Sequence, residues 1–143
     1  MHAIRRAGAQ DLENVARLHR LVRRTNLPFL PDLHTAEEDV RFFRDTVFAQ
    51  CEIWVAGHID GFIAFREGWI DHLYVRPECQ RGGIGKALLA RAMQAGSPLR
   101  LWVFQRNTDA IAFYRSQGFR EIERTDGSRN EEREPDMLME WRT

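Results

Sequence analysis

A glycine-rich stretch, "ECQRGGIGKALL" (78–89), stands in the middle of the chain, directly ahead of an apolar run. Glycine costs a helix interior roughly 0.8 to 1 kcal/mol relative to alanine, so three glycines at a helix entrance indicate a backbone that a ligand must approach closely. Free N–H groups at a helix N-terminus bind anions, phosphate among them. The stretch therefore predicts a site for a phosphate-bearing ligand.

Two common phosphate loops do not fit this stretch. A P-loop would match at Gly85 and Lys86, but Gln80 replaces its first glycine and Ala87 replaces its magnesium-binding hydroxyl. The dinucleotide fingerprint GxGxxG fails at its third glycine, where Leu88 stands. An NTPase and a dinucleotide-binding enzyme are therefore not expected.

A third pattern, Q/R-x-x-G-x-G/A, is satisfied in register by Gln80, Gly83 and Gly85. A strand candidate, "WIDHLYV" (69–75), ends shortly before it. A later segment has an asparagine, an A-x-x-F/Y-Y run and a GF ending, at Asn107, Ala110, Phe113, Tyr114, Gly118 and Phe119. In these motifs the sequence resembles the GCN5-related N-acetyltransferase (GNAT) family, and the resemblance spans nearly the whole chain.

The resemblance implies an enzyme that transfers an acetyl group from acetyl-CoA to a primary amine of a small molecule or a protein, by direct attack in a ternary complex. In the family, backbone N–H groups of the glycine loop wrap the pyrophosphate, and the strand before the loop holds the pantetheine arm. The residues that the resemblance assigns to coenzyme binding are Leu73, Tyr74, Val75, Gln80, Arg81, Gly82, Gly83, Ile84, Gly85, Lys86, Asn107 and Tyr114.

Two alternatives stay open at this point. One is a non-catalytic module of the same fold that binds acyl-CoA or a partner protein, and the other is a transferase of a different acyl group. Tyr114 and Asn107 together favour an enzyme, because a pure binding module needs only the loop.

Acetyl transfer needs a proton donor for the departing thiolate and a base for the amine. Tyr114 matches the family tyrosine near the coenzyme sulfur, where its phenol can act as general acid. Glu67 and Asp71 are the candidate bases, and strand alternation places both on the face of Leu73, with His72 on the opposite face. The sequence does not choose among these residues or exclude a water chain in their place.

The acceptor site is implied by the same resemblance. In the family it is formed by the first two helices, their connection and the late strand pair. Here those segments are "TNLPFLPDLHT" (25–35) and "DGSRNEEREPD" (126–136). The second segment carries charges of both signs, which is typical of a solvated loop.

The elements that must position these residues alternate in type along the chain. Helices are predicted over 11–24, 35–47, 83–95 and 107–117, from apolar spacing and from the capping box of Thr35 and Glu38. Strands are predicted over 2–7, 51–56, 61–66, 69–75, 99–105, 119–125 and 137–141. This order predicts an α+β fold, in which one mixed, mostly antiparallel twisted sheet is flanked by helices in a single domain, 1–143.

Composition excludes several other classes of protein. The chain of 143 residues has 21 basic and 21 acidic side chains, so no net field favours nucleic acid. It has no apolar run near the ~20 residues of a membrane span, no metal-ligand spacing among its histidines and cysteines, and no signal peptide. We therefore expect a cytoplasmic protein with no metal, no nucleic-acid partner and no membrane partner, and the family resemblance implies a possible homodimer.

Overall fold

The structure, a computed structural model, describes residues 3–143. The strands are β1 (Ile4–Arg6), β2 (Glu52–Ala56), β3 (Gly61–Arg66), β4 (Trp69–Val75), β5 (Leu99–Phe104), β6 (Arg120–Thr125) and β7 (Asp136–Trp141). The longer helices are α1 (Leu12–Asn26), α2 (Ala36–Phe42), α4 (Ile84–Ala95) and α5 (Thr108–Ser116). Short helical turns are η1 (Ala9–Asp11), η2 (Phe43–Val47), α3 (Phe48–Gln50) and η3 (Pro77–Cys79). The first predicted strand begins at His2, which lies outside the described residues.

Within residues 3–143 the strands form one seven-stranded sheet in the order β1-β2-β3-β4-β5-β7-β6. Neighbouring strands are antiparallel except β4 and β5, which are parallel. The prediction of a mixed, mostly antiparallel sheet is therefore confirmed, and β2, β3 and β4 form an antiparallel meander within it. No helix in this described part is long and apolar enough to cross a membrane.

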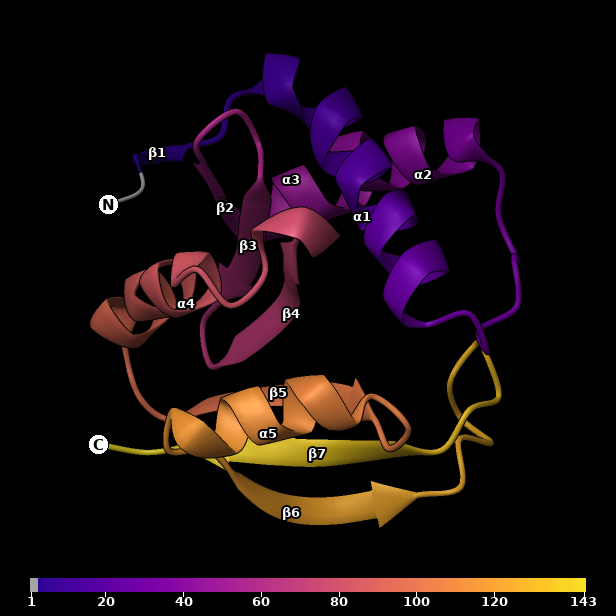
Figure 1. Cartoon of the computed structure of the whole chain (residues 1–143), viewed down its shortest axis with the longest axis vertical. Coiled ribbons are helices and arrows are strands. Elements are labelled where there is room, and N and C mark those ends of the chain that lie inside the picture. Colours follow the sequence, from indigo (N-terminus) through magenta and orange to yellow (C-terminus); the bar gives the residue numbers. More distant parts are fainter. Residues whose placement is uncertain (1–2) are drawn as a thin grey trace.

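Helices cover the sheet on two faces (Figure 1). On one face α4 and α5 bury residues such as Leu88 and Ile111 against β3, β5 and β7. On the other face α1 and the turn after α2 bury Leu18 and Phe43 against β2 and β3. Thr35 caps α2 as predicted, but the helical path continues past Val47 to Gln50 through a π-helical turn.

The parallel strands β4 and β5 separate almost as soon as they meet. Their register consists of one pair, Trp69 with Arg100, next to a hydrogen bond from the Arg100 N–H to the Gly68 carbonyl at 2.9 Å. From Ile70 onward β4 follows β3 while β5 follows β7, so the sheet opens toward the carboxyl ends of both strands. Figure 1 shows the β1–β4 half above and the β5–β7 half below this opening.

A β-bulge in β4 changes the faces that the sequence predicts. Phe65 pairs with Ile70 and Ala64 with His72, so Asp71 is an extra residue with no partner opposite it. His72 faces α1 and α2, as strand alternation predicts. The prediction that Asp71 lies on the face of Leu73 is wrong, because the Asp71 carboxylate accepts a hydrogen bond from Cys51, which packs against the α1 side of the sheet.

Candidate active site

The glycine loop leads directly into the N-terminus of α4. Gly83 is the N-cap residue, with a φ of 90°, and no side chain caps the helix. This left-handed conformation is easily adopted by glycine and strains other residues. Arg81, two residues earlier, also has a positive φ, of 67°. The first-turn N–H groups of α4 have no partner in the helix itself, so this end can bind an anion.

Gln80 holds the loop in place. Its side-chain amide donates to the Val75 carbonyl at 2.9 Å and to the Asn26 side chain at 3.2 Å, which joins the loop to the ends of β4 and α1. Gly85 lies against Phe113 of α5, whose ring would be 3.4 Å from an added Cβ. Both motif positions therefore have a geometric role in the unliganded loop.

The opening between β4 and β5 contains a cavity of about 90 Å³, here called the splay cavity. Five of the residues predicted from the sequence line it, namely Asp71, Leu73, Tyr74, Asn107 and Tyr114. Val75 and the loop residues from Gln80 to Lys86 do not line this cavity and lie after it along the chain. Asn107 also caps α5, since its side chain accepts from the Ala110 N–H at 3.3 Å.

Tyr114 is buried, with 8% of its surface exposed. Burial first, and then the neighbouring Tyr74, raise the pKa of Tyr114 above its ordinary value. Burial also raises the pKa of Tyr74, and the Arg23 guanidinium offsets part of that rise. Both phenols are therefore protonated at neutral pH, and Tyr114 has a proton to donate into the splay cavity.

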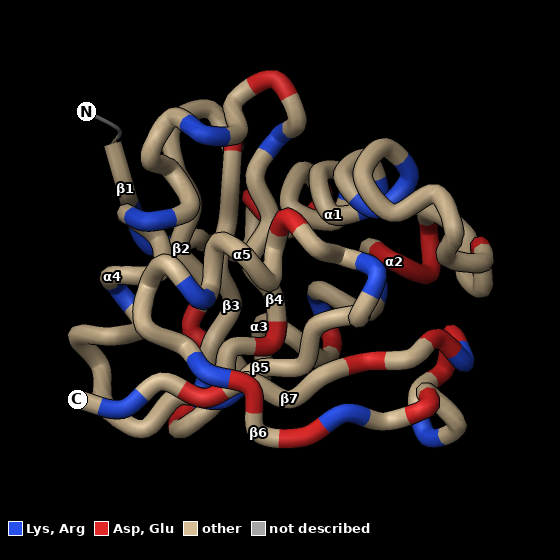
Figure 2. Tube along the Cα trace, turned by 60° about the horizontal axis from the view of Figure 1, so that its bottom comes forward, with Lys and Arg blue, Asp and Glu red and all other residues tan. Residues whose placement is uncertain are grey.

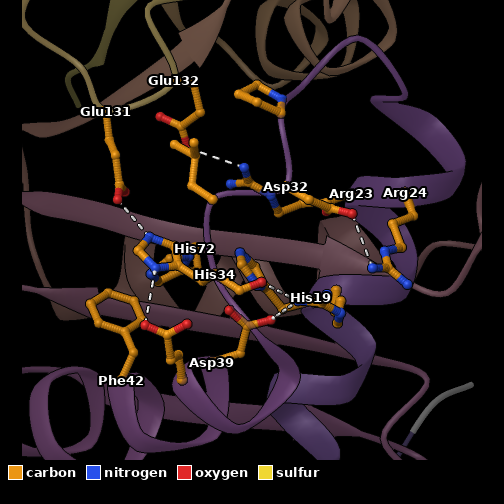
Figure 3. Close-up of a pocket in the computed structure, with 14 residues that line it drawn as sticks. His19, Arg23, Arg24, Asp32, His34, Asp39, Phe42, His72, Glu131 and Glu132 are labelled. Carbon is orange, nitrogen blue, oxygen red and sulfur yellow. Dashed lines mark hydrogen bonds and ion pairs between the residues drawn. The ribbon is translucent and has the colours of Figure 1, made fainter.

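A larger cavity of about 370 Å³ lies among α1, α2, their connection and the β6–β7 loop, and is here called the helix cavity. Figure 3 shows the side chains around it. Arg23 of α1 bonds to Glu132 at 3.1 Å, and His34 of the connection bonds to Glu131 at 2.6 Å. The two segments that the sequence analysis assigns to the acceptor are thus side by side in the structure.

Two histidines line the helix cavity, of which His19 is buried and His72 is partly buried. His19 of α1 and His72 of β4 meet edge to face, with ring centroids 5.4 Å apart. The Nδ1 atom of each ring is buried and finds no hydrogen-bond partner among residues 3–143. Burial lowers the pKa of His72 to about 4 and also lowers the pKa of His19, so both imidazoles are neutral at pH 7. His72 also belongs to the lining of the splay cavity, so one residue borders both cavities.

Sequence reasoning weighed His72 but missed His19. The signal for His19 was its position on the apolar face of α1, four residues after Val15 and three before Val22. An apolar helix face normally buries hydrocarbon side chains. A histidine on that face is therefore a candidate for a binding or catalytic role. The contact with His72 itself is tertiary and cannot be predicted from spacing.

The structure places the two candidate bases differently. Glu67 is exposed in the turn between β3 and β4 and lines neither cavity. Asp71 lines the splay cavity, but its carboxylate accepts two hydrogen bonds from Arg66, at 2.7 and 3.2 Å. Both carboxylates are more exposed to solvent than His72.

Comparison with known proteins places this geometry in a family. The profile of the acetyltransferase (GNAT) domain matches residues 49–121. The chain is 35% identical over 102 residues to the peptidyl-lysine N-acetyltransferase YiaC of Escherichia coli, with 68% of each sequence covered. The matched residues 49–121 include the meander, the glycine loop and α5.

Solved structures share the fold over nearly the full length. The solution structure of apo YjaB from Escherichia coli superposes with a TM-score of 0.79 at 22% identity, covering 99% of this chain and 97% of that one. The PaiA N-acetyltransferase of Thermoplasma acidophilum, crystallised with coenzyme A, superposes with a TM-score of 0.77 at 23% identity, covering 100% and 99%. The chain belongs to the GCN5-related N-acetyltransferase family, enzymes that transfer an acetyl group from acetyl-CoA to an amine.

Proposed function

We propose that this protein acetylates the side-chain amine of lysine residues in other proteins, with acetyl-CoA as donor, by direct attack in a ternary complex. The observation that carries this proposal is that His72 lines both cavities. An amine in the helix cavity would reach the thioester of a coenzyme in the splay cavity at this residue. The choice of lysine is supported by the relative YiaC, a peptidyl-lysine N-acetyltransferase.

In this proposal the coenzyme lies along the opening of the sheet. Its pyrophosphate binds the N–H groups of the loop 80–86 at the start of α4. Its pantetheine arm follows the β4 backbone from Leu73 to Val75, where β5 supplies no pairing strand, and Asn107 lies on the opposite wall. Arg81 and Lys86 are exposed and contribute positive charge near the phosphates, whereas the loop backbone determines the binding geometry.

Tyr114 is the proposed general acid. Its hydroxyl is protonated at neutral pH because burial raises its pKa, and its side chain lines the splay cavity. When the C–S bond breaks, the thiolate needs a proton, and a phenol at that position can supply it.

His72 is the proposed base, in preference to Asp71 and Glu67. Its neutral imidazole can accept a hydrogen bond from the amine and take its proton once the C–N bond has formed. At that stage the nitrogen is far more acidic than a free ammonium group, so a weakly basic imidazole suffices. Asp71 is instead held by Arg66, and Glu67 lies outside both cavities.

The test uses a lysine peptide whose N-terminus is blocked, incubated with the protein and acetyl-CoA. We expect release of free thiol and the gain of one acetyl group on the lysine by mass spectrometry. His72→Gln should lower kcat by roughly 10²-fold, whereas His58→Gln, at an exposed turn, should leave kcat unchanged. Binding of acetyl-CoA without turnover of any amine would instead establish the non-catalytic alternative.

Two further predictions concern the protein in the cell. A homodimer is implied by the family resemblance, and a cytoplasmic location is proposed because the two cysteines, Cys51 and Cys79, show no paired spacing. Both stay predictions, to be checked by analytical ultracentrifugation and by cell fractionation.

A further inference from the structure

The charged groups around the helix cavity are unequal in number. Its lining contains five carboxylates and three guanidinium groups. Each guanidinium is paired with one carboxylate, in the pairs Arg20–Asp39, Arg23–Glu132 and Arg24–Asp32. Within residues 3–143 no arginine lies within ion-pair distance of Glu38 or Glu131, both of which lie beside His34, so the carboxylates of the lining outnumber its guanidinium groups.

Glu38 and Glu131 come from opposite sides of the cavity. Glu38 lies on α2 and Glu131 on the β6–β7 loop, and both side chains are about half exposed, at 44% and 56%. His34 lies between them, with Nδ1 3.9 Å from Glu38 and Nε2 2.6 Å from Glu131. Figure 3 shows Glu131 directed at His34 from the β6–β7 loop, and in Figure 2 acidic positions mark both α2 and this loop.

Apolar side chains accompany this acidic pair. Leu33 and Phe42 line the same cavity and are each 45% exposed, which is unusual for large apolar residues of this chain. An exposed apolar contact beside a binding cavity is typical of a surface that a partner covers. The mouth of the cavity thus presents two acidic side chains, Glu38 and Glu131, next to the apolar side chains of Leu33 and Phe42.

The inner end of the cavity independently indicates a polar ligand. His19 is 8% exposed. The Nδ1 atoms of His19 and His72 both lack a hydrogen-bond partner among residues 3–143. A buried polar atom without a partner costs free energy unless a ligand or water satisfies it. The cavity volume of about 370 Å³ is near the lower end of the roughly 300 to 1,000 Å³ of ligand sites. It therefore accommodates one side chain and leaves the neighbouring residues of that chain at the mouth.

We infer that the preferred acceptor is a lysine with a second basic side chain beside it, in an extended peptide segment. Glu38 and Glu131 bind the second cation, and Leu33 and Phe42 contact the hydrocarbon stem of its side chain. This inference rests on the proposed lysine acetyltransferase function and specifies its substrate. Acidic residues beside the lysine are excluded by repulsion from the same two carboxylates.

The test compares kcat/KM for three blocked peptides of equal length, in which the lysine is flanked by glycine, arginine or aspartate. An exposed charge pair contributes little free energy. We therefore expect kcat/KM for the arginine peptide to exceed kcat/KM for the glycine peptide by roughly threefold for each carboxylate that the arginine contacts, and kcat/KM for the aspartate peptide to be lower than that for the glycine peptide. The difference should shrink in about 1 M salt, since exposed charges are then screened.

Variants assign the effect to the acidic pair. Glu131→Gln and Glu38→Gln should each lower the ratio of kcat/KM for the arginine peptide to kcat/KM for the glycine peptide. Glu38→Gln keeps an oxygen for the Thr35 N–H, so the cap of α2 is retained. Glu37→Gln is the matched control, because Glu37 is an exposed acid of the same helix that does not line the cavity.

The outcomes separate this inference from the function beneath it. Equal kcat/KM for all three peptides, each acetylated on lysine, would overturn the inference and leave the proposed function intact. A free diamine acetylated faster than every peptide would also overturn it. No acetylation of any peptide would contradict the proposed function itself.

Discussion

Tyr114 and His72 approach the splay cavity from different elements, one from α5 and one from β4. Burial shifts the pKa of each in the direction that keeps it uncharged at neutral pH, upward for the phenol and downward for the imidazole. In the proposed mechanism the neutral phenol of Tyr114 donates a proton and the neutral imidazole of His72 accepts one.

Removing the Tyr114 hydroxyl tests the proton donor. Tyr114→Phe keeps the ring that packs against Phe113 and Phe119, so the fold should be retained. We expect kcat to fall by roughly 10² to 10⁴ while the Kd for acetyl-CoA changes little, measured by thiol release and by calorimetry. An unchanged kcat with intact coenzyme binding would remove Tyr114 from the chemistry.

The pKa of His72 also makes stability depend on pH. It is about 4 in the folded protein, against an ordinary 6.5, so the unfolded chain binds more protons between these values. The free energy of unfolding should therefore fall as pH drops from about 6.5 toward 4, by on the order of 3 kcal/mol from this residue. Urea unfolding across this range measures it.

The matched pair of variants isolates that contribution. His72→Gln should reduce the dependence of the free energy of unfolding on pH between 6.5 and 4, leaving the part that His19 contributes, while the exposed His58→Gln should leave the slope as it is. A slope that His72→Gln does not change would mean that His72 titrates normally in the folded protein.

Among the elements, the glycine loop and α4 are the proposed binding site of the coenzyme pyrophosphate. Gly83→Val places a β-branched residue at a φ of 90°, which strains the loop backbone, and its side chain would enter the open space beside the helix start. We expect it to abolish binding of acetyl-CoA, measured by calorimetry. Lys86→Ala, on the exposed side of α4, should weaken binding by less than about threefold. A larger loss for Lys86→Ala than for Gly83→Val would show that side-chain charge, not the backbone, binds the phosphates.

Local signals explain which elements could be predicted from the sequence. The capping box of Thr35 and Glu38 and the spacing of Gln80, Gly83 and Gly85 depend on neighbours within a few residues, and the helices begin where these signals place them. No sequence feature predicts the positive φ of Arg81, because arginine rarely adopts this conformation.

The bulge and the histidine pair lie beyond such signals. The bulge at Asp71 arises because its neighbours Ile70 and His72 pair with the adjacent residues Phe65 and Ala64 of β3. The face of Asp71 therefore could not be predicted from strand alternation alone. The contact of His19 with His72 joins α1 to β4 and exists only in the folded chain.

At the scale of the whole molecule, the opening of the sheet and the helices beside it each contribute one cavity, and His72 borders both. The splay cavity lies between the halves of the sheet, and the helix cavity lies among α1, α2 and the β6–β7 loop. His72 belongs to both, which is why a donor and an acceptor bound on either side could react directly. The central claim is that the two cavities form a single connected site.

A bisubstrate analogue, coenzyme A joined through an acetyl bridge to the side-chain nitrogen of a lysine peptide, tests this claim most directly. Its Kd by calorimetry should be at least about 10² times lower than that of coenzyme A alone, since linking two occupied sites raises affinity by roughly 10² to 10⁴. A Kd equal to that of coenzyme A would contradict the account, because it would mean that the peptide portion cannot reach the helix cavity from the splay cavity.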